Sequence, residues 1–310
     1  MEKINQRFLE RHKKILEDDF ENFLDFIKKE SPRRYIRTNT LKIDPKDLKK
    51  RLEDKGWRLK EISWYPIAFE VLEKEETPIG STLEYSLGYY YPQDKSSMIP
   101  PLVLDPKPGE VILDLCAAPG SKTTQMAQHM ENRGVILAND IDLERIKALA
   151  SNVQRMGCIN VIITRNDGRK FKKVGEMFDK VLVDAPCTGT GTLIWDLSIT
   201  NRWSPKLSLN FSRLQFSLLS AGFSCLKPGG ALVYSTCSLE PEENEAVISD
   251  FLKTFENAKI EKIKIKGIKH IKGILEWEKN SFDEEVKKCW RIYPHFNNSE
   301  GFFISKIRKL

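Results

Sequence analysis

From residue 111 onward, short apolar stretches alternate with longer segments of helical periodicity. The apolar stretches have the length and the β-branched content of buried strands. Because parallel neighbouring strands need a long crossover, usually a helix, this alternation predicts an α/β fold with a doubly wound, mostly parallel sheet. The predicted strands are Val111–Leu115, Gly134–Asn139, Val161–Arg165, Lys180–Asp184 and Ala231–Ser235, and the predicted helices include Lys122–Met130, Asp142–Met156 and Leu207–Cys225.

The N-terminal part of the chain follows a different pattern. Apolar residues spaced by three and four positions predict one amphipathic helix from Ile4 to Ile27, which Ser31-Pro32 ends. A β-prone segment rich in cations follows at residues 33–42, and a short helix is expected from Asp44 to Lys55, where Gly56 ends it. These elements predict a small α+β module.

The net charge of +6 is concentrated in this module. Residues 1–60 contain 18 Lys and Arg against 12 Asp and Glu, whereas the rest of the chain is balanced, with 32 of each sign. A basic excess at one end predicts an acidic partner there, and nucleic acid is the commonest such partner. Prolines at residues 104–109 punctuate the chain nearby. We therefore expect a basic N-terminal module at residues 1–90 and the α/β domain at residues 91–310.

Cysteine usage, hydropathy and histidine spacing exclude several classes of protein. The six cysteines include no C-x-x-C pair, which indicates free thiols in a reducing cytoplasm rather than a disulfide scaffold or a zinc ribbon. No apolar run approaches the roughly 18 residues that a membrane span needs. The four histidines show no ligand spacing, and residues 240–243 favour a proline-started helix over a metal site. We expect a cytoplasmic monomer with neither a membrane nor a metal partner.

The first predicted strand of the α/β domain runs into a loop of small residues between Asp114 and Lys122. Such a turn lets a ligand approach the backbone and the unpaired amides of the following helix. The loop lacks the glycines of G-x-G-x-x-G, which argues against a dinucleotide. The second strand ends at Asp140, where a carboxylate can accept hydrogen bonds from ribose hydroxyls. A nucleoside cofactor without a pyrophosphate fits both features, and a purely structural turn is the alternative.

Two later strands end in cysteine motifs, Asp184-Ala185-Pro186-Cys187 and Ser235-Thr236-Cys237-Ser238. The carboxyl ends of parallel strands meet at one edge of a sheet, so both thiols are expected at the same site. A thiolate that adds to carbon 6 of a pyrimidine makes carbon 5 nucleophilic towards an electrophilic methyl group. Asp184 can hold the base, and the second thiol can assist product release. The residue pattern leaves open which thiol attacks.

Together, these motifs resemble the Sun/Fmu family of S-adenosylmethionine-dependent RNA cytosine-5 methyltransferases. Four further segments are similar to stretches of that family: Arg37–Leu41 to its RNA-binding segment, Tyr90–Met98 to the stretch before the core, and Pro294-His295 with Glu300–Phe303 to its closing strands. The resemblance spans nearly the whole chain. It implies a Rossmann-like class I methyltransferase domain, with the N-terminal module binding RNA.

The resemblance also implies a cofactor, S-adenosyl-L-methionine, and a role for each motif. Asp140 is expected to bind the ribose hydroxyls, Asp167 to lie by the adenine, and Arg145 and Asp184 to line the same site. Cys237 is expected to be the nucleophile and Cys187 to help release the product, with Asp184 as the third catalytic group. The loop expected to wrap the methionine and ribose portions comprises Cys116, Ala117, Ala118, Pro119, Gly120, Ser121 and Lys122.

The expected function is therefore methyl transfer to carbon 5 of a cytosine in RNA through a covalent cysteine adduct. Transfer RNA is the preferred substrate and ribosomal RNA remains an alternative. A methyltransferase acting on a protein or an amine is a second possibility. Such an enzyme has no use for a Thr-Cys nucleophile, so retained activity after Cys237→Ala would favour it. A non-catalytic RNA-binding or assembly factor that keeps the fold is a third, from a different class.

Two regions outside these motifs carry separate expectations. The strict alternation of Lys262–Lys266 predicts a half-buried strand whose isoleucines face inward and whose lysines form a solvated face. Trp195 and Trp203 follow the Pro-Cys motif, and either can stack on a base or pack in the core. The sequence leaves that choice open.

Overall fold

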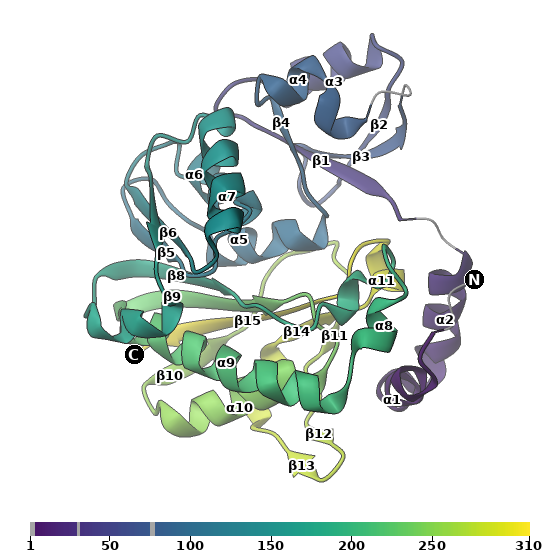
Figure 1. Cartoon of the computed structure of the whole chain (residues 1–310), viewed down its shortest axis with the longest axis vertical. Helices are drawn as coiled ribbons and strands as arrows, with labels where there is room; N and C mark the ends of the chain where they lie inside the picture. The colour runs from purple at the N-terminus through teal and green to yellow at the C-terminus, as the bar shows by residue number, and fades with distance from the viewer. Residues whose placement is uncertain (1–3, 30–31, 75–77) are drawn as a thin grey trace.

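The structure, a computed structural model, describes residues 4–29, 32–74 and 78–310. Its largest element is a nine-stranded sheet in this described part, with the order β11-β14-β15-β9-β8-β5-β6-β7 and β10 paired to β15 (Figure 1). The strands from β9 to β7 in this order are mutually parallel. They are β5 (Val111–Asp114), β6 (Val135–Asp140), β7 (Val161–Arg165), β8 (Phe178–Asp184) and β9 (Leu226–Thr236).

The remaining strands of this sheet run antiparallel to their neighbours and extend it beyond β9. They are β10 (Ala258–Glu261), β11 (Ile271–Lys272), β14 (Trp290–Ile292) and β15 (Phe302–Lys309); a separate hairpin joins β12 (Glu276–Trp277) to β13 (Asn280–Ser281). The predicted α/β class with a mostly parallel, doubly wound sheet is confirmed, and each of the five predicted strands is present within a few residues of its expected bounds.

Helices cover both faces of the sheet, as doubly wound folds require (Figure 1). One face carries α5 (Ile99–Leu104), α6 (Ser121–His129) and α7 (Leu143–Met156), and the other carries α9 (Pro205–Ser224) and α10 (Glu245–Thr254). Two separate apolar clusters result, one on each side of the strands. The parallel strands are therefore continuous apolar runs in the sequence, because their side chains are buried on both faces of the sheet.

The strand order reverses between β5 and β8. The chain builds β5, β6 and β7 in one direction, then returns to place β8 and β9 on the other side of β5. Ligands of such sheets bind at the carboxyl edge beside this reversal. Asp114 and Asp184 are the last residues of the two flanking strands, so both carboxyls lie at that point.

A four-stranded antiparallel sheet of the described residues, ordered β2-β3-β1-β4, forms the N-terminal module. Its strands are β1 (Arg34–Thr38), β2 (Arg58–Glu61), β3 (Ala68–Glu73) and β4 (Tyr90–Pro92). Helix α3 (Pro45–Glu53) begins at Asp44, whose carboxyl accepts a hydrogen bond from the Lys46 amide, and Gly56 follows it with φ +81°. Leu48 and Leu52 pack this helix on the sheet. A short helix, α4 (Leu83–Ser86), lies before β4.

The single N-terminal helix predicted from the periodicity is wrong. The chain forms α1 (Gln6–Leu16) and α2 (Phe20–Lys29), separated by a 3-10 turn at Glu17–Asp19 in which Glu17 has φ +48°. The apolar spacing continues across the break because both helices bury their apolar sides. Ser31, expected to end the helix with Pro32, lies outside the described residues.

Helices α1 and α2 lie against the α/β domain rather than on the four-stranded sheet (Figure 1). Phe8 and Phe23 share an apolar cluster with Trp203, Leu239 and Tyr293. Residues 1–90 therefore divide in space. The four-stranded sheet and the two helices contact different parts of the α/β domain.

The strand expected at Lys262–Lys266 is also wrong. Strand β10 ends at Glu261, and residues 262–265 have no strand pairing. The predicted alternation of burial is present, since the lysines are exposed and Ile263 joins an apolar cluster. Burial on one side needs an extended backbone but no hydrogen-bonded neighbour, so periodicity alone could not distinguish the two cases. Across the described ranges, no helix has the length and apolar character needed to cross a membrane.

Candidate active site

The loop between β5 and α6 makes a tight turn at the carboxyl edge of the sheet. Gly120 has φ +101°, and a Cβ at this position would lie 2.9 Å from Cδ1 of Leu149. Both facts favour glycine, because residues with a side chain rarely adopt this backbone conformation and a Cβ atom here would be too close to Leu149 of α7. Helix α6 begins at the next residue, Ser121, so its first amides point towards the loop.

Asp140, at the end of β6, lies directly beside this loop. Its carboxyl accepts hydrogen bonds from the backbone amides of Ala118 (3.1 Å) and Asp142 (3.1 Å). The Arg145 guanidinium lies 3.4 Å from the same carboxyl and also donates to the Ala118 carbonyl. The structure therefore brings together three residues that the sequence predicted for one site.

Asp167 lies on the neighbouring strand connection. The Asn166 amide donates to the Asp140 carbonyl (3.2 Å), which places the end of β7 beside the end of β6. The Asp167 carboxyl caps the following 3-10 helix (Gly168–Lys173) and pairs with Arg169 at 2.6 Å. That side-chain hydrogen bond to Arg169 keeps the pKa of Asp167 below its usual value.

Asp184 and Lys122 form a partly buried ion pair at the strand reversal. The Lys122 ammonium lies 2.7 Å from one oxygen of Asp184 and 3.0 Å from the Ser97 hydroxyl, while Ser235 donates to the other oxygen at 2.7 Å. Burial opposes the charge on Lys122, but Asp184 outweighs it and raises the lysine pKa. The thiol of Cys237 is close enough to interact with the same cation. Lys122 is thus a permanent positive charge beside both groups.

Asp114, on the other side of the reversal, is almost completely buried. It accepts a hydrogen bond from the Thr123 hydroxyl at 2.6 Å, while its second oxygen has no partner within the described residues. Burial raises its pKa to about 7. This carboxyl can therefore take up a proton or a donor group from a ligand at neutral pH.

The two motif cysteines meet at this edge. Their sulfur atoms lie 3.4 Å apart, and both side chains are half-buried. The hydrogen bond to Cys237, together with burial and the nearby Glu243 carboxyl, raises the pKa of Cys187 well above its ordinary value. At neutral pH Cys187 therefore carries its proton. The other four cysteines are also free thiols, and Cys158, Cys225 and Cys289 are buried.

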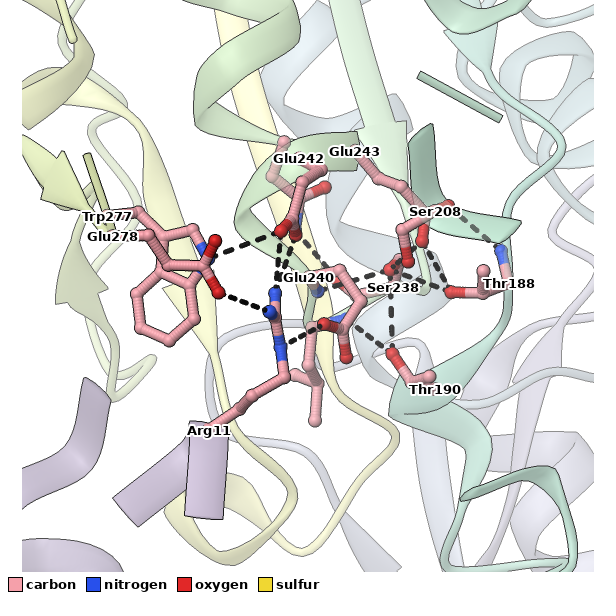
Figure 2. Close-up of polar contacts among 12 residues, drawn as sticks. Arg11, Thr188, Thr190, Ser208, Ser238, Glu240, Glu242, Glu243, Trp277 and Glu278 are labelled. Atoms are coloured by element: carbon pink, nitrogen blue, oxygen red, sulfur yellow. Dashed lines mark hydrogen bonds and ion pairs between the residues drawn. The ribbon is translucent and has the colours of Figure 1, made fainter. Parts of the chain in front are cut away.

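Glu243 joins the two cysteine loops and was missed as a site residue by the sequence reasoning. Its buried carboxyl accepts hydrogen bonds from the Thr188 amide (2.9 Å), the Thr188 hydroxyl (2.5 Å), the Ser238 hydroxyl (2.9 Å) and the Gln215 side chain (3.0 Å). Thr188 follows Cys187, and Ser238 follows Cys237. In Figure 2, Thr188 and Ser238 point towards the Glu243 carboxyl. No signal in the sequence marked Glu243, because α9 contains many polar residues besides Gln215.

The acids next to Glu243 hold the N-terminal helix. Arg11 of α1 pairs with Glu240 at 3.1 Å and with Glu242 at 2.7 Å, and it reaches Glu278 at 3.3 Å (Figure 2). Arg11 and Glu240 are both buried. The acidic run after the Thr-Cys motif, interpreted from the sequence as a helix start, therefore anchors α1 to the catalytic loop. In the described ranges, no three His, Cys, Asp or Glu side chains cluster to suit a metal ion.

Arg37 does not belong to an exposed RNA-binding surface, contrary to the expectation for Arg37–Leu41. Its side chain is fully buried between β1 and α6. It donates to the Ser121 carbonyl (2.8 Å), the Gln93 side chain (2.6 Å) and the Thr124 hydroxyl (2.9 Å). Burial lowers its pKa from the ordinary value. Arg37 therefore links the N-terminal module to the predicted cofactor loop, and sequence alone could not distinguish this cation from its exposed neighbours.

Comparison with known proteins was decisive for the family. A family model described as 16S rRNA methyltransferase RsmB/F matches residues 101–308, and a model of the N-terminal domain of RsmF matches residues 4–95. The chain belongs to the RsmB/F methyltransferase family. Membership confirms the family and the enzyme class that the sequence predicted.

Curated relatives agree with the RsmB/F assignment. The chain is 45% identical over 307 residues to the "tRNA (cytosine(49)-C(5))-methyltransferase" of Pyrococcus abyssi, covering 99% of this chain and 97% of that protein. It is 40% identical over 282 residues to the "Ribosomal RNA small subunit methyltransferase F" of Aliivibrio salmonicida, covering 89% of this chain but 58% of that protein. The RsmF relative is thus much longer than the matched region.

A solved structure supports the same RsmB/F architecture. NSun6 from Pyrococcus horikoshii, crystallised with SFG, superposes with a TM-score of 0.84 and 25% identity, covering 98% of each chain. Both the N-terminal module and the methyltransferase domain are therefore shared with that protein.

Proposed function

We propose that this protein transfers a methyl group from S-adenosylmethionine to carbon 5 of a cytosine in tRNA, through a covalent adduct between Cys237 and carbon 6 of the base. One observation carries this proposal: two thiols lie 3.4 Å apart beside a lysine–aspartate pair at the strand reversal. A methyltransferase acting on a protein or an amine has no use for this arrangement. A non-catalytic assembly factor has no use for it either.

The residues at the carboxyl edge suit S-adenosylmethionine. This cofactor carries positive charge at its sulfonium and amino groups, and the carboxyls of Asp114, Asp140 and Asp184 lie at the ends of three adjacent strands. One Asp114 oxygen has no hydrogen-bond partner among the described residues, so a donor can bind there. The two Asp140 oxygens retain lone pairs for ribose hydroxyls. The loop at residues 116–122 would wrap the cofactor, with Asp167 and Arg145 at its margin.

When bound, the cofactor supplies an electrophilic methyl group. The chain's own residues make carbon 5 nucleophilic enough to take it. The Cys237 sulfur forms a bond to carbon 6, and the electron pair displaced from the ring makes the new bond from carbon 5 to the methyl group. Removal of the carbon 5 proton then returns electrons to the ring, the bond between sulfur and carbon 6 breaks, and the thiolate leaves.

The neighbouring groups support this division of roles. Lys122 and Asp184 form the charged wall against which the base is held, and Lys122 stabilises the negative charge that develops during attack. Cys187 keeps its proton at neutral pH, which suits proton exchange during elimination better than attack. The choice of Cys237 as the nucleophile rests on the family resemblance and on Lys122, whose cation interacts electrostatically with the Cys237 sulfur.

Transfer RNA is favoured over ribosomal RNA by sequence similarity. The relative named as a tRNA methyltransferase is 45% identical to this chain over 307 residues, whereas the RsmF relative is 40% identical over 282 residues. Ribosomal RNA is the second candidate, because the identity to RsmF is almost as high.

The test is incubation of the purified protein with radiolabelled S-adenosylmethionine and total RNA, followed by size fractionation and nucleoside analysis. We expect label in 5-methylcytidine from the tRNA fraction. Label in ribosomal RNA alone would favour the second candidate. Cofactor binding without label in any RNA fraction would overturn the proposal.

A further inference from the structure

Of the six tryptophans, all in the described part of the chain, Trp195 is the most exposed. Its exposed fraction is 41%, whereas Trp203 is 4% exposed and packs against Phe8 and Arg11. The structure thus distinguishes the environments of Trp195 and Trp203, which the sequence left open. Trp203 is a core residue, and Trp195 presents ring surface to solvent on the loop between the Pro-Cys motif and α8 (Ile199–Arg202).

Arg34 lies over this ring from the other half of the molecule. It is the first residue of β1, and its guanidinium carbon is 5.4 Å from the Trp195 ring centroid. Within the described residues, the Arg34 guanidinium has no hydrogen bond or ion pair. Its neighbour Arg58 pairs with Glu73 at 2.9 Å. Arg34 therefore keeps its donors available to an external acceptor.

The Trp195 loop is fixed to the loop of the proposed nucleophile. The Trp195 amide donates to the carbonyl of Thr192, the residue after Gly191, at 2.9 Å. The Gly301 amide donates to the Gly191 carbonyl at 2.8 Å, and the Gly191 amide donates to the Cys237 carbonyl at 2.8 Å. A Cβ at Gly191 would lie 2.3 Å from the Gly301 carbonyl oxygen, so this contact needs glycine. A ligand bound to Trp195 would therefore be held at a fixed position relative to Cys237.

We propose that Arg34 and Trp195 form a platform for an unpaired nucleotide of the substrate RNA that flanks the methylated cytosine. The base stacks on the open part of the indole ring, and Arg34 binds its phosphate. This inference rests on the proposed function, since a cytosine that enters the site must leave its own stack and expose its neighbours. Aromatic rings beside free arginines are the usual means of holding such nucleotides.

The rival explanation is that the contact merely fastens β1 to the catalytic half. The two explanations differ in what RNA does to the indole ring. A stacked base quenches tryptophan emission, whereas a fastening contact is already complete without RNA.

The experiment compares tRNA binding and methyl transfer in the full chain and in Trp195→Phe, Trp195→Ala and Arg34→Ala. We expect tRNA to quench the emission of the unaltered protein, and Trp195→Phe to lose most of this quenching. Trp195→Ala should raise the KM for tRNA by about 5- to 100-fold, the range for losing one base stack. Its KM for S-adenosylmethionine should not change. Ile159→Ala, which alters an exposed residue before β7 at the opposite edge, is the matched control.

An unchanged KM for tRNA in a folded Trp195→Ala variant would overturn the platform, as would full quenching in Trp195→Phe. Thermal unfolding of each variant distinguishes loss of binding from loss of structure. Failure of the proposed function has a separate signature: the unaltered protein would then form no 5-methylcytidine in RNA. Quenching through Trp195 can be measured whether or not the methyl group is transferred.

Discussion

The Cys187 and Cys237 sulfur atoms lie 3.4 Å apart, although fifty residues separate them in the sequence. Their strands are parallel neighbours, with Asp184 opposite Ser235. Cys187 lies three residues after the end of β8, and Cys237 directly follows the end of β9. Strand pairing brings the two loops together, and the Glu243 carboxyl then joins the residues that follow the two thiols.

Replacing each thiol should stop the reaction at a different stage. Cys237→Ala should abolish methyl transfer while cofactor binding stays close to normal, because the carboxyls expected to hold the cofactor lie on other strands. Cys187→Ala should accumulate a denaturant-resistant protein–RNA adduct, because elimination loses its proton carrier. Gel electrophoresis after denaturation measures the adduct. A methylating Cys237→Ala variant, or a Cys187→Ala variant without adduct, would contradict these roles.

Glu243→Gln should lower kcat by about 10-fold or more without a matching change in the KM for RNA. The amide cannot accept all four hydrogen bonds, so the cysteine loops lose their fixed separation, and small displacements of reacting groups are costly. The rate of Cys187–Cys237 disulfide formation with diamide reports the separation independently and should also fall. Glu256→Gln, an exposed substitution, is the control. Unchanged oxidation and turnover would show that Glu243 does not position the thiols.

Arg37→Met should destabilise the protein and weaken cofactor binding rather than RNA binding. The substitution removes a donor from the Ser121 carbonyl and from two buried side chains, which costs about 1–3 kcal/mol for each buried group that is left without a partner. Denaturant unfolding and the KM for S-adenosylmethionine measure the two effects. The slope of RNA affinity against salt should stay as it was, since a buried cation contacts no phosphate.

Charge reversal at Arg34 should affect RNA binding rather than stability, the opposite of what we expect for Arg37→Met. Arg34→Glu should weaken RNA binding and flatten its salt dependence, with little change in unfolding free energy, because the side chain is exposed. Filter binding over a range of salt concentrations measures this. A steep, unchanged salt slope would place the RNA path elsewhere on the surface.

Asp114 should make stability depend on pH in a defined direction. Burial raises its pKa from 3.8 to about 7, so the folded state holds a proton that the unfolded chain releases. This contribution is fully present below about pH 4, falls as pH rises, and is lost above pH 7. The loss approaches about 4 kcal/mol. Asp114→Asn should therefore gain unfolding free energy over the unaltered protein between pH 4 and pH 8. A difference that is constant with pH, measured by urea unfolding, would contradict this.

Sequence patterns predicted the parallel core well because burial on both faces makes its strands distinctive. Val161–Arg165 was expected with the bounds that β7 has, and the other strands shifted by a few residues. Where one face alone is buried, the pattern was ambiguous. It continued through the break at Glu17, where the backbone changes conformation but the apolar spacing does not, and it suggested a strand at Lys262–Lys266 where no neighbour pairs.

The candidate site was predictable where its residues end strands, as Asp140 and Asp184 do, although Asp114 was not predicted as a site residue. Residues that support the site from elsewhere were not. Glu243 looked like an ordinary helix-start acid, and Arg37 looked like one of several exposed cations. Their roles depend on which segments fold against them, and that information is absent from local spacing.

The position of α1 and α2 has a practical consequence for anyone dividing this protein. Arg11 of α1 is bonded to Glu240 and Glu242, which follow the Thr-Cys loop, and Phe8 and Phe23 cover Trp203 and Tyr293. Cutting the chain near residue 90 to isolate the α/β half would remove these partners. The remaining fragment would carry the buried Glu240 and the half-buried Glu242 without their arginine, and a newly solvated aromatic patch. We therefore expect the smallest active unit to retain α1 and α2.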